Sequence, residues 1–174
     1  MSTRGALGFK KEGVLKVQYN HFDSYPTGLG TKIVEDLNKY SSNPKDWVDA
    51  LNEAFKDIQL VDGEAKPTQE EINYCADYGI EYRNDEWLEE WFSLLNKAQG
   101  NLELYLNGFK YMVDAGEEWL NDKLFCEWSY IFNLDNNTLE INNGCYEDTT
   151  VIPIESLTTD EMELVEKKYY ERRS

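Results

Sequence analysis

The sequence contains little of what metal-binding, disulfide-bonded or membrane proteins require. Among 174 residues there is one histidine, and the three cysteines, Cys75, Cys126 and Cys145, are widely spaced. We therefore expect reduced thiols, no metal site and no cofactor. No run approaches the roughly 20 apolar residues of a membrane helix, and residues 1–13 lack the apolar segment of a signal peptide. These absences predict a cytoplasmic protein with no membrane partner.

Positive charge is also scarce, and it is unevenly distributed. The chain has 17 Lys/Arg against 34 Asp/Glu, a net charge of -17. Residues 1–46 hold seven Lys/Arg against five Asp/Glu, whereas residues 47–166 carry 28 acids against six bases. Because neutralising phosphates requires the opposite sign, this surface argues against direct nucleic-acid binding.

Apolar periodicity in the first half predicts a hairpin followed by helices. Alternation over residues 4–20, interrupted by a turn at 11–13, predicts the β-hairpin. Helical spacing predicts helices near residues 31–40 and 47–58, the second with Asp46 as a possible N-cap, and a third beginning at Thr68. A fourth helix is predicted over residues 85–100, stopping at Gly100, with a buried stripe formed by Trp87, Leu88, Trp91, Leu94 and Leu95.

The second half turns toward β-structure. The aromatic run at 123–135 and the segment 138–144 predict a second hairpin, and residues 149–157 predict an edge strand because Pro153 cannot donate to a ladder. Thr158 and Glu161 are spaced as a capping box that opens a final helix. The sequence thus predicts one α+β domain over residues 1–174, an antiparallel sheet built from N- and C-terminal hairpins with a central helical segment and a C-terminal helix.

Four blocks resemble an uncharacterised protein family of tailed phages, prophages and bacteria. They are TRG at 3–5, YNHFDSYPTGLG at 19–30, WFSLLNKAQG at 91–100 and LFCEWSYIFNLDNNTLEI at 124–141. A more distant fungal branch is similar in its D-x-Y-P-x-G-x-G core. The resemblance implies a small accessory protein that acts on host physiology or host defence, in the host cytoplasm if the gene is phage-encoded.

The segment YNHFDSYPTGLG is the strongest candidate site. Glycines just before a helix let the backbone approach a ligand, and the helix start offers N-H groups that favour an anion. Tyr25, held by Pro26, can stack on the ring of a ligand. The guanidinium of Arg4, on the first strand of the predicted hairpin, can bind a phosphate or carboxylate. Lys10 and Lys32 would add the local positive potential that an anion needs. The predicted ligand-binding residues are Arg4, Asn20, His21, Asp23, Tyr25, Gly28, Gly30 and Glu127.

Structural and catalytic interpretations of this segment stand beside the ligand site. The pattern D-x-Y-P-x-G is also typical of a tight turn, in which the Asp23 side chain makes an Asx-type hydrogen bond to the backbone and Gly28 or Gly30 takes a positive φ. His21 and Asp23 lie on the same side of an extended chain and could act as general base and orienter. Removal of Met1 would expose Ser2 as an N-terminal nucleophile, a minor hydrolase alternative.

Two features farther along the chain also raise chemical possibilities. Cys126 lies in an aromatic strand and is better explained as a small core residue than as a thiol nucleophile. Residues 135–137 resemble part of a calcium loop but lack its glycine and terminal glutamate, so a hairpin turn is the better interpretation.

Two functional hypotheses from different classes follow. In the first, the protein binds and sequesters a small anionic, nucleotide-like ligand, counteracting host defence, and binding is favoured over enzymatic turnover. In the second, the acidic segment imitates DNA or docks a basic host protein and inhibits it by occupying its surface.

Overall fold

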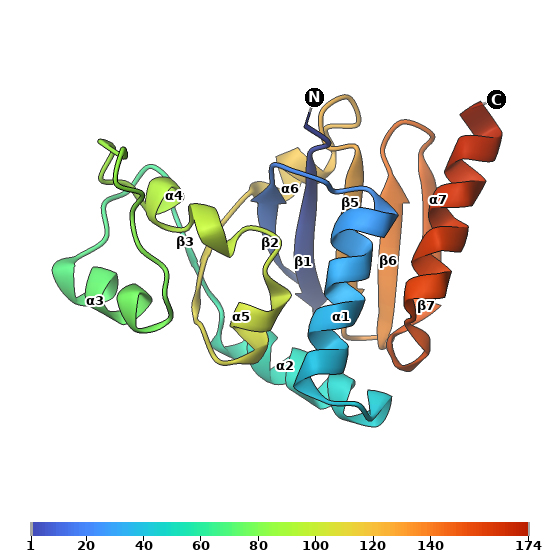
Figure 1. Ribbon diagram of the computed structural model, residues 1–174, viewed down its shortest axis with the longest axis horizontal. Coiled ribbons are helices and arrows are strands. Elements are labelled where there is room, and N and C mark those ends of the chain that lie inside the picture. The colour runs from blue at the N-terminus through green and yellow to red at the C-terminus, as the bar shows by residue number, and fades with distance from the viewer. Residues whose placement is uncertain (1, 174) are drawn as a thin grey trace.

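The computed structural model describes residues 2–173 and contains a five-stranded sheet flanked by helices (Figure 1). The strand order is β2-β1-β5-β6-β7. The strands are β1 (Gly5–Lys11), β2 (Val14–Asn20), β5 (Trp128–Asn133), β6 (Thr138–Asn143) and β7 (Asp148–Pro153). Both predicted hairpins and the edge position of β7 are confirmed, as is the α+β class.

The two hairpins meet through a parallel pair. β1 runs antiparallel to β2, and β5 and β6 each pair antiparallel with the next strand, but β1 and β5 are parallel in register from Gly5–Trp128 to Lys10–Asn133. The sheet is therefore mostly antiparallel with one parallel pair. That pair is parallel because the long segment between the hairpins returns the chain to the end of the sheet where β1 begins.

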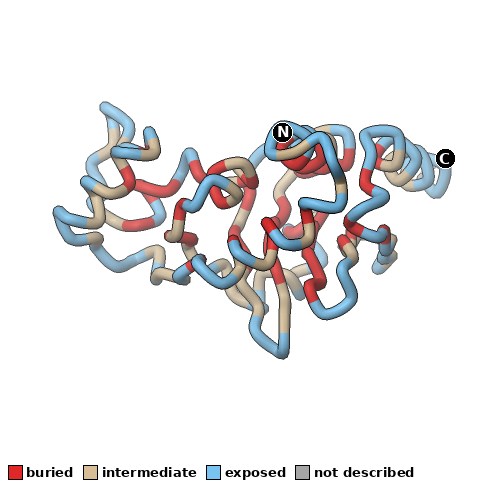
Figure 2. Tube along the Cα trace, turned by 90° about the horizontal axis from the view of Figure 1, so that it is seen from below, coloured by how far each residue is buried: buried red, intermediate tan, exposed pale blue. Residues whose placement is uncertain are grey.

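Two helices cover one face of the sheet and a short helix covers part of the other. α1 (Thr31–Tyr40) and α7 (Thr159–Arg173) lie over the first face, where the main core forms between them and the strands (Figure 1). α6 (Gly116–Leu120) packs against a smaller cluster on the opposite face. Figure 2 shows buried residues in the interior of the molecule and exposed residues along its periphery. None of the described helices combines the length and apolarity needed to span a membrane.

The central segment forms a helical lobe beside strand β2. It carries a two-stranded parallel sheet and several short helices and turns. These elements are η2 (Pro44–Asp46), α2 (Trp47–Asp57), β3 (Gln59–Val61), α3 (Gln69–Asp77), α4 (Trp91–Leu94), η3 (Asn96–Ala98), α5 (Leu102–Leu106) and β4 (Tyr111–Val113). Outside the lobe, the 3-10 turn η4 (Ile154–Ser156) connects β7 to α7.

Helix caps follow the sequence patterns with one exception. Thr68 and Glu71 form a reciprocal capping box at α3, and the Thr158 hydroxyl accepts a hydrogen bond from the Glu161 amide at 3.2 Å. Asp46 occupies the N-cap position of α2 as predicted, but its side chain makes no cap hydrogen bond. The Asn43 side chain caps the preceding turn η2 instead.

The predicted helix over residues 85–100 is wrong in its first half. Residues 85–90 form no helix, and the Trp87 side chain is 83% exposed, although Trp91, Leu94 and Leu95 are buried as predicted. The amides of Trp91 and Phe92 donate to the carbonyls of Ala65 and Gly63, at 2.9 and 3.0 Å. Because these bonds tie the backbone to a neighbouring loop, only the turn α4 and the following 3-10 turn η3 are helical in this stretch.

Strand β2 enters α1 through one π-helical turn, η1 (Pro26–Gly30), whose glycines are needed for close packing. A Cβ on Gly28 would lie 2.2 Å from the Asp23 carbonyl oxygen, and one on Gly30 would lie 2.7 Å from the Met162 sulfur. Neither glycine takes a positive φ, so that expectation is wrong; the left-handed residue of the turn is Asp23, at φ 53°.

We predict that Gly28→Ala lowers the free energy of unfolding by roughly 1–3 kcal/mol, because the added methyl group forces η1 away from the Asp23 carbonyl. Urea unfolding monitored by circular dichroism measures this change. Thr27→Ala is the matched control, since Thr27 is exposed and loses one surface hydrogen bond, to Glu166. A Gly28 variant as stable as the Thr27 variant would contradict this packing role.

Candidate functional site

A pocket of about 1030 Å³ lies at the end of β2, where the sheet edge meets the helical lobe. Its lining comes from four parts of the chain. They are the end of β2 and the following loop (Tyr19, Asn20, His21, Phe22, Asp23), the start of the first helix (Gly28, Leu29, Lys32), the lobe (Arg83, Phe92, Asn96, Gln99, Gly100) and α6 (Trp119). Its size is at the upper end of the range for small-molecule sites.

Aromatic rings form one wall of this pocket. Tyr19 packs edge-on against Trp119 with ring centroids 5.0 Å apart, and its ring lies 6.3 Å from that of Phe92. The Tyr19 hydroxyl is hydrogen-bonded to Nδ1 of His21, whose ring lies 4.3 Å from that of Phe22. Phe22 is 65% exposed, so the wall ends in an apolar ring that remains open to solvent.

The loop that carries His21 to Asp23 is anchored by the fully buried Ser24. The Tyr130 hydroxyl donates to the Ser24 carbonyl at 2.7 Å, and the Ser24 amide donates to the Thr3 carbonyl at 3.1 Å. Asn20 donates to the Ser24 hydroxyl at 2.9 Å. Because these bonds are buried, they hold the loop in one position beside the pocket.

The opposite wall is tied to β2 through Gln18. Its side-chain oxygen accepts a hydrogen bond from the Gly100 amide at 2.8 Å, and its nitrogen donates to the Tyr105 hydroxyl at 3.3 Å. Gly100 has φ 66°, and a Cβ there would lie 2.7 Å from Oδ1 of Asn20. Gly100 therefore brings the lobe against β2, as well as ending the helical turns that precede it.

Two cationic side chains reach the pocket in an otherwise acidic protein. Lys32 pairs with Asp36 at 2.9 Å, and Arg83 pairs with Asp85 at 3.5 Å. Both cations are about half-exposed, but their partners differ, since Asp85 is exposed whereas the Asp36 side chain is only 8% exposed. The exposed Arg83–Asp85 pair contributes little to stability, whereas the buried Asp36 carboxylate depends on its partners. A phosphate or carboxylate entering the pocket can therefore recruit Arg83 at small cost, whereas Lys32 has to contact the ligand while it remains beside Asp36.

The start of the first helix is less open to an anion than the sequence suggests. The Gly28 and Leu29 amides donate to the Tyr25 and Asp23 carbonyls, at 2.9 and 2.8 Å. Tyr25 packs against the main core rather than lining the pocket. The charge of Asp23, followed by partial burial and a hydrogen bond to the same carboxylate, raises the pKa of Tyr25. Asp23 thus acts on Tyr25 and on the backbone of the turn.

Arg4 and Glu127 lie side by side, but neither is among the residues that line the pocket. The Arg4 amide donates to the Glu127 carboxylate at 3.2 Å, and the Glu127 amide donates to the Arg4 carbonyl at 3.0 Å. The Arg4 guanidinium lies over the Phe125 ring, 5.4 Å from its centroid. Burial raises the pKa of Tyr19, and the charge of Arg4 opposes this increase. Arg4 therefore affects a side chain of the pocket wall electrostatically without lining the pocket itself.

The arrangement gives catalysis little support. The Nδ1 atom of His21 is paired with Tyr19, and no hydrogen bond joins His21 to Asp23 within residues 2–173. Ser2 is partly buried and is not a pocket-lining residue, and Met1, whose removal would free it, lies outside the described residues.

Cys126 and the turn after β5 fit their structural interpretations. Cys126 is buried in the small cluster beneath α6, and its thiol lies 3.8 Å from the Trp128 carbonyl oxygen. The Asn133 side chain accepts hydrogen bonds from the Asp135 and Asn136 amides, which closes the hairpin turn. The described part of the chain brings together no group of three or more His, Cys, Asp or Glu side chains suited to a metal ion.

Comparisons of the chain with protein-family models, curated proteins and solved structures found no match.

Sequence reasoning missed the pocket residues that lie outside the quoted segment. Arg83 and Phe92 belong to the stretch that was predicted to form or border a helix, and Trp119 lies on a one-turn helix. The block WFSLLNKAQG is one of the four that carry the family resemblance, and it contains the pocket residues Phe92, Asn96, Gln99 and Gly100. The presence of this block beside YNHFDSYPTGLG in the same resemblance was the sequence feature that could have indicated a shared site.

We predict that Cys145 is the reactive thiol of the native protein. Cys145 is exposed, whereas burial raises the pKa of Cys75 to about 11 and that of Cys126 to about 12. Because the thiolate is the nucleophile, iodoacetamide at neutral pH should label Cys145 first and the other two only after unfolding. Mass spectrometry of native and urea-treated protein measures this order. Rapid native labelling of Cys126 would restore it as a candidate nucleophile.

Proposed function

We propose that the pocket at the end of β2 binds a small anionic, nucleotide-like ligand and holds it without turnover. The observation that carries this proposal is the composition of the pocket. In a chain with net charge -17, its lining combines a wall of aromatic rings with two cations, Lys32 and Arg83, against the single acid Asp23.

The aromatic wall supports recognition of a planar ring. Phe22 and Phe92 are 65% and 44% exposed, and both line the pocket. Stacking of a base on such a ring contributes about 1–3 kcal/mol and tolerates different bases, because every base has a π-face.

Polar groups in the same pocket support binding of the remaining parts of a nucleotide. Lys32 and Arg83 supply positive charge for phosphate, and Arg83 offers a planar fork of donors. The side chains of Asn96 and Gln99 each carry donors and acceptors suited to a base edge or a sugar hydroxyl.

The resemblance to phage and prophage proteins supports a role in counteracting host defence. A protein that sequesters a signalling nucleotide needs affinity and a rigid site, and it needs no catalytic group. The buried hydrogen bonds at Ser24 and Gln18 favour such rigidity.

We predict that Arg83→Ala and Phe92→Ala each weaken nucleotide binding by about tenfold or more, through loss of a charge-assisted contact and of stacking. Isothermal titration calorimetry with mononucleotides and cyclic nucleotides measures the affinity. Lys66→Ala and Trp87→Ala are matched controls, because Lys66 makes an exposed ion pair and Trp87 is 83% exposed, and neither lines the pocket.

The proposal fails if no nucleotide binds, or if the two control substitutions weaken binding as much as the pocket substitutions do. Unchanged thermal unfolding of the four unliganded variants would show that any loss belongs to the pocket rather than to the fold.

A second candidate function, capture of a basic host protein, is favoured by helix α2. Asp46, Asp49, Glu53 and Asp57 are exposed, lie at three- or four-residue spacing and line a groove of about 570 Å³. Such a row gives complementary charge for a basic helix or a DNA-binding surface.

For this candidate, the paired substitution Asp49→Asn with Glu53→Gln is expected to weaken binding to a basic model protein such as a histone by about tenfold at low salt. Surface plasmon resonance across a salt series measures the change. Glu35→Gln with Glu64→Gln is the control, since neither residue lines the groove. Equal loss in both pairs would indicate nonspecific attraction and reject the decoy function.

A further inference from the structure

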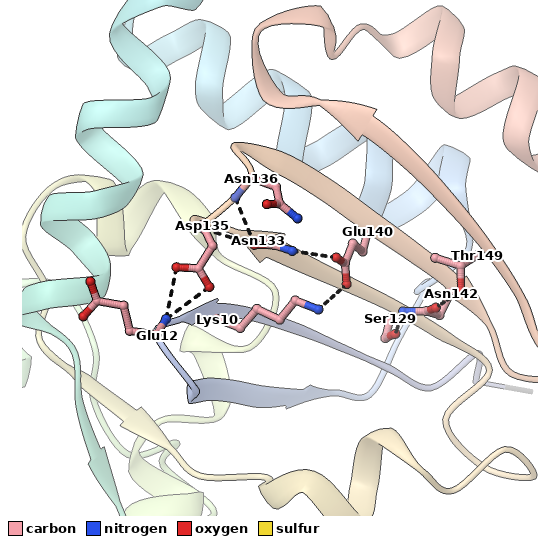
Figure 3. Close-up of polar contacts among 9 residues, drawn as sticks. All are labelled: Lys10, Glu12, Ser129, Asn133, Asp135, Asn136, Glu140, Asn142 and Thr149. Carbon is pink, nitrogen blue, oxygen red and sulfur yellow. Dashed lines mark hydrogen bonds and ion pairs between the residues drawn. The ribbon is translucent and has the colours of Figure 1, made fainter.

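A second groove, of about 590 Å³, lies on the sheet face opposite α1 and α7. α6 covers only part of this face, and the groove runs past it across β5, β6 and β7 (Figure 3). Ser129 and Ile131 of β5 and Glu140 and Asn142 of β6 lie along its floor. No residue of this groove lines the pocket at the end of β2.

Polar side chains on the floor are fixed by one another. Asn142 donates to the Ser129 hydroxyl at 3.2 Å and accepts a hydrogen bond from the Thr149 hydroxyl at 2.5 Å, so one row crosses three strands. In a second row, Glu140 accepts hydrogen bonds from Lys10 at 2.6 Å and from Asn133 at 2.9 Å (Figure 3). These bonds orient the groups before any ligand arrives.

Several charged side chains of the groove are paired within the protein. Lys10 pairs with Glu140, and Lys123 pairs with Glu147 at 2.7 Å across the end of the groove. Asp148 is bound by Arg172 at 3.1 Å. Partial burial raises the pKa of Glu140, but the hydrogen bonds from Lys10 and Asn133 outweigh it and lower that pKa overall. At these paired side chains a free ion has to displace an existing partner, whereas a neutral ligand does not.

The groove retains unused hydrogen-bonding capacity beside an apolar wall. The Ser129 hydroxyl accepts from Asn142 and still has a proton to donate, and the Asn142 amide has a second N-H. Leu15, Leu120 and Ile131 provide apolar surface in the same groove. Donors and acceptors next to aliphatic surface match the hydroxyl groups and C-H faces of a sugar ring.

A solvated sheet face is the alternative explanation, since the open side of an antiparallel sheet is commonly polar. Two observations favour a built site. Ser129 lines the groove yet is only 5% exposed, and its side chain belongs to the interlocked row rather than pointing freely into water. Glu140 of the floor is likewise held by Asn133, which is 7% exposed and does not itself line the groove.

We propose that this groove binds a neutral, polyhydroxylated ligand of the saccharide class. The Ser129–Asn142–Thr149 row binds its hydroxyl groups, and the aliphatic wall packs against its C-H face. This site is separate from the proposed nucleotide pocket and does not depend on it.

Saturation-transfer NMR of the full chain tests the proposal with maltose, lactose and N-acetylglucosamine, compared with cationic glucosamine and anionic glucuronate. A binding measurement is preferred to a thermal shift, because sugars stabilise proteins generally by exclusion from the surface. The informative variants are Asn142→Ala, which removes the centre of the row, and Thr149→Trp, which fills the groove from an exposed position. Asn38→Ala, on α1 and facing solvent, is the matched control.

The expected result is saturation transfer to at least one neutral saccharide, reduced about tenfold in affinity by both groove substitutions and unchanged by Asn38→Ala. Absence of transfer to all three neutral saccharides would overturn the proposal. Equal binding by Thr149→Trp, or a preference for either charged sugar, would overturn it as well. Native-like amide spectra of the variants establish that lost binding is not lost folding.

Discussion

The buried Ser24 anchor is the constraint on which the strand-to-helix connection and the pocket depend. The backbone amide, carbonyl and hydroxyl of Ser24 are all hydrogen-bonded, and the residue is 0% exposed. A Cβ on Gly5 would lie 2.6 Å from that of Ser24, so only glycine at the start of β1 leaves room for it. An unsatisfied partner at this depth would cost about 1–3 kcal/mol, which is a large part of the stability of a domain this size.

This anchor explains why one short segment carries so many special residues. Asp23 takes a left-handed conformation, Gly28 packs on the Asp23 carbonyl, and Gly30 lies against Met162 of α7. Each of these residues allows the chain to change direction between the end of β2 and the start of α1. The same geometry places His21 and Phe22 in the lining of the pocket, so the loop that makes the turn also forms one wall of the proposed site.

The lobe contributes the other half of the pocket because Gln18 bonds to Gly100 across 82 residues of sequence. That bond places Phe92 and Arg83 opposite the loop and concentrates two cations in an acidic protein. Most acids lie outside this pocket, including the exposed row on α2, and in the groove on the opposite sheet face Lys10 and Lys123 are paired with Glu140 and Glu147. The three surfaces therefore differ in charge, and the three proposals rest on that difference.

The sequence by itself determined the elements whose signals are local. Alternation fixed both hairpins, the Thr68–Glu71 box fixed the start of α3, and the Cys126 environment followed from its apolar neighbours. Only the tertiary structure decided the parallel pairing of β1 with β5, because strand direction depends on where a long connection returns. It also broke the helix predicted over residues 85–100, where hydrogen bonds to Gly63 and Ala65 override helical periodicity. The pocket likewise depends on both local and long-range features. The segment YNHFDSYPTGLG indicated one wall, whereas Arg83, Phe92 and Trp119 come together only through long-range packing that no local pattern encodes.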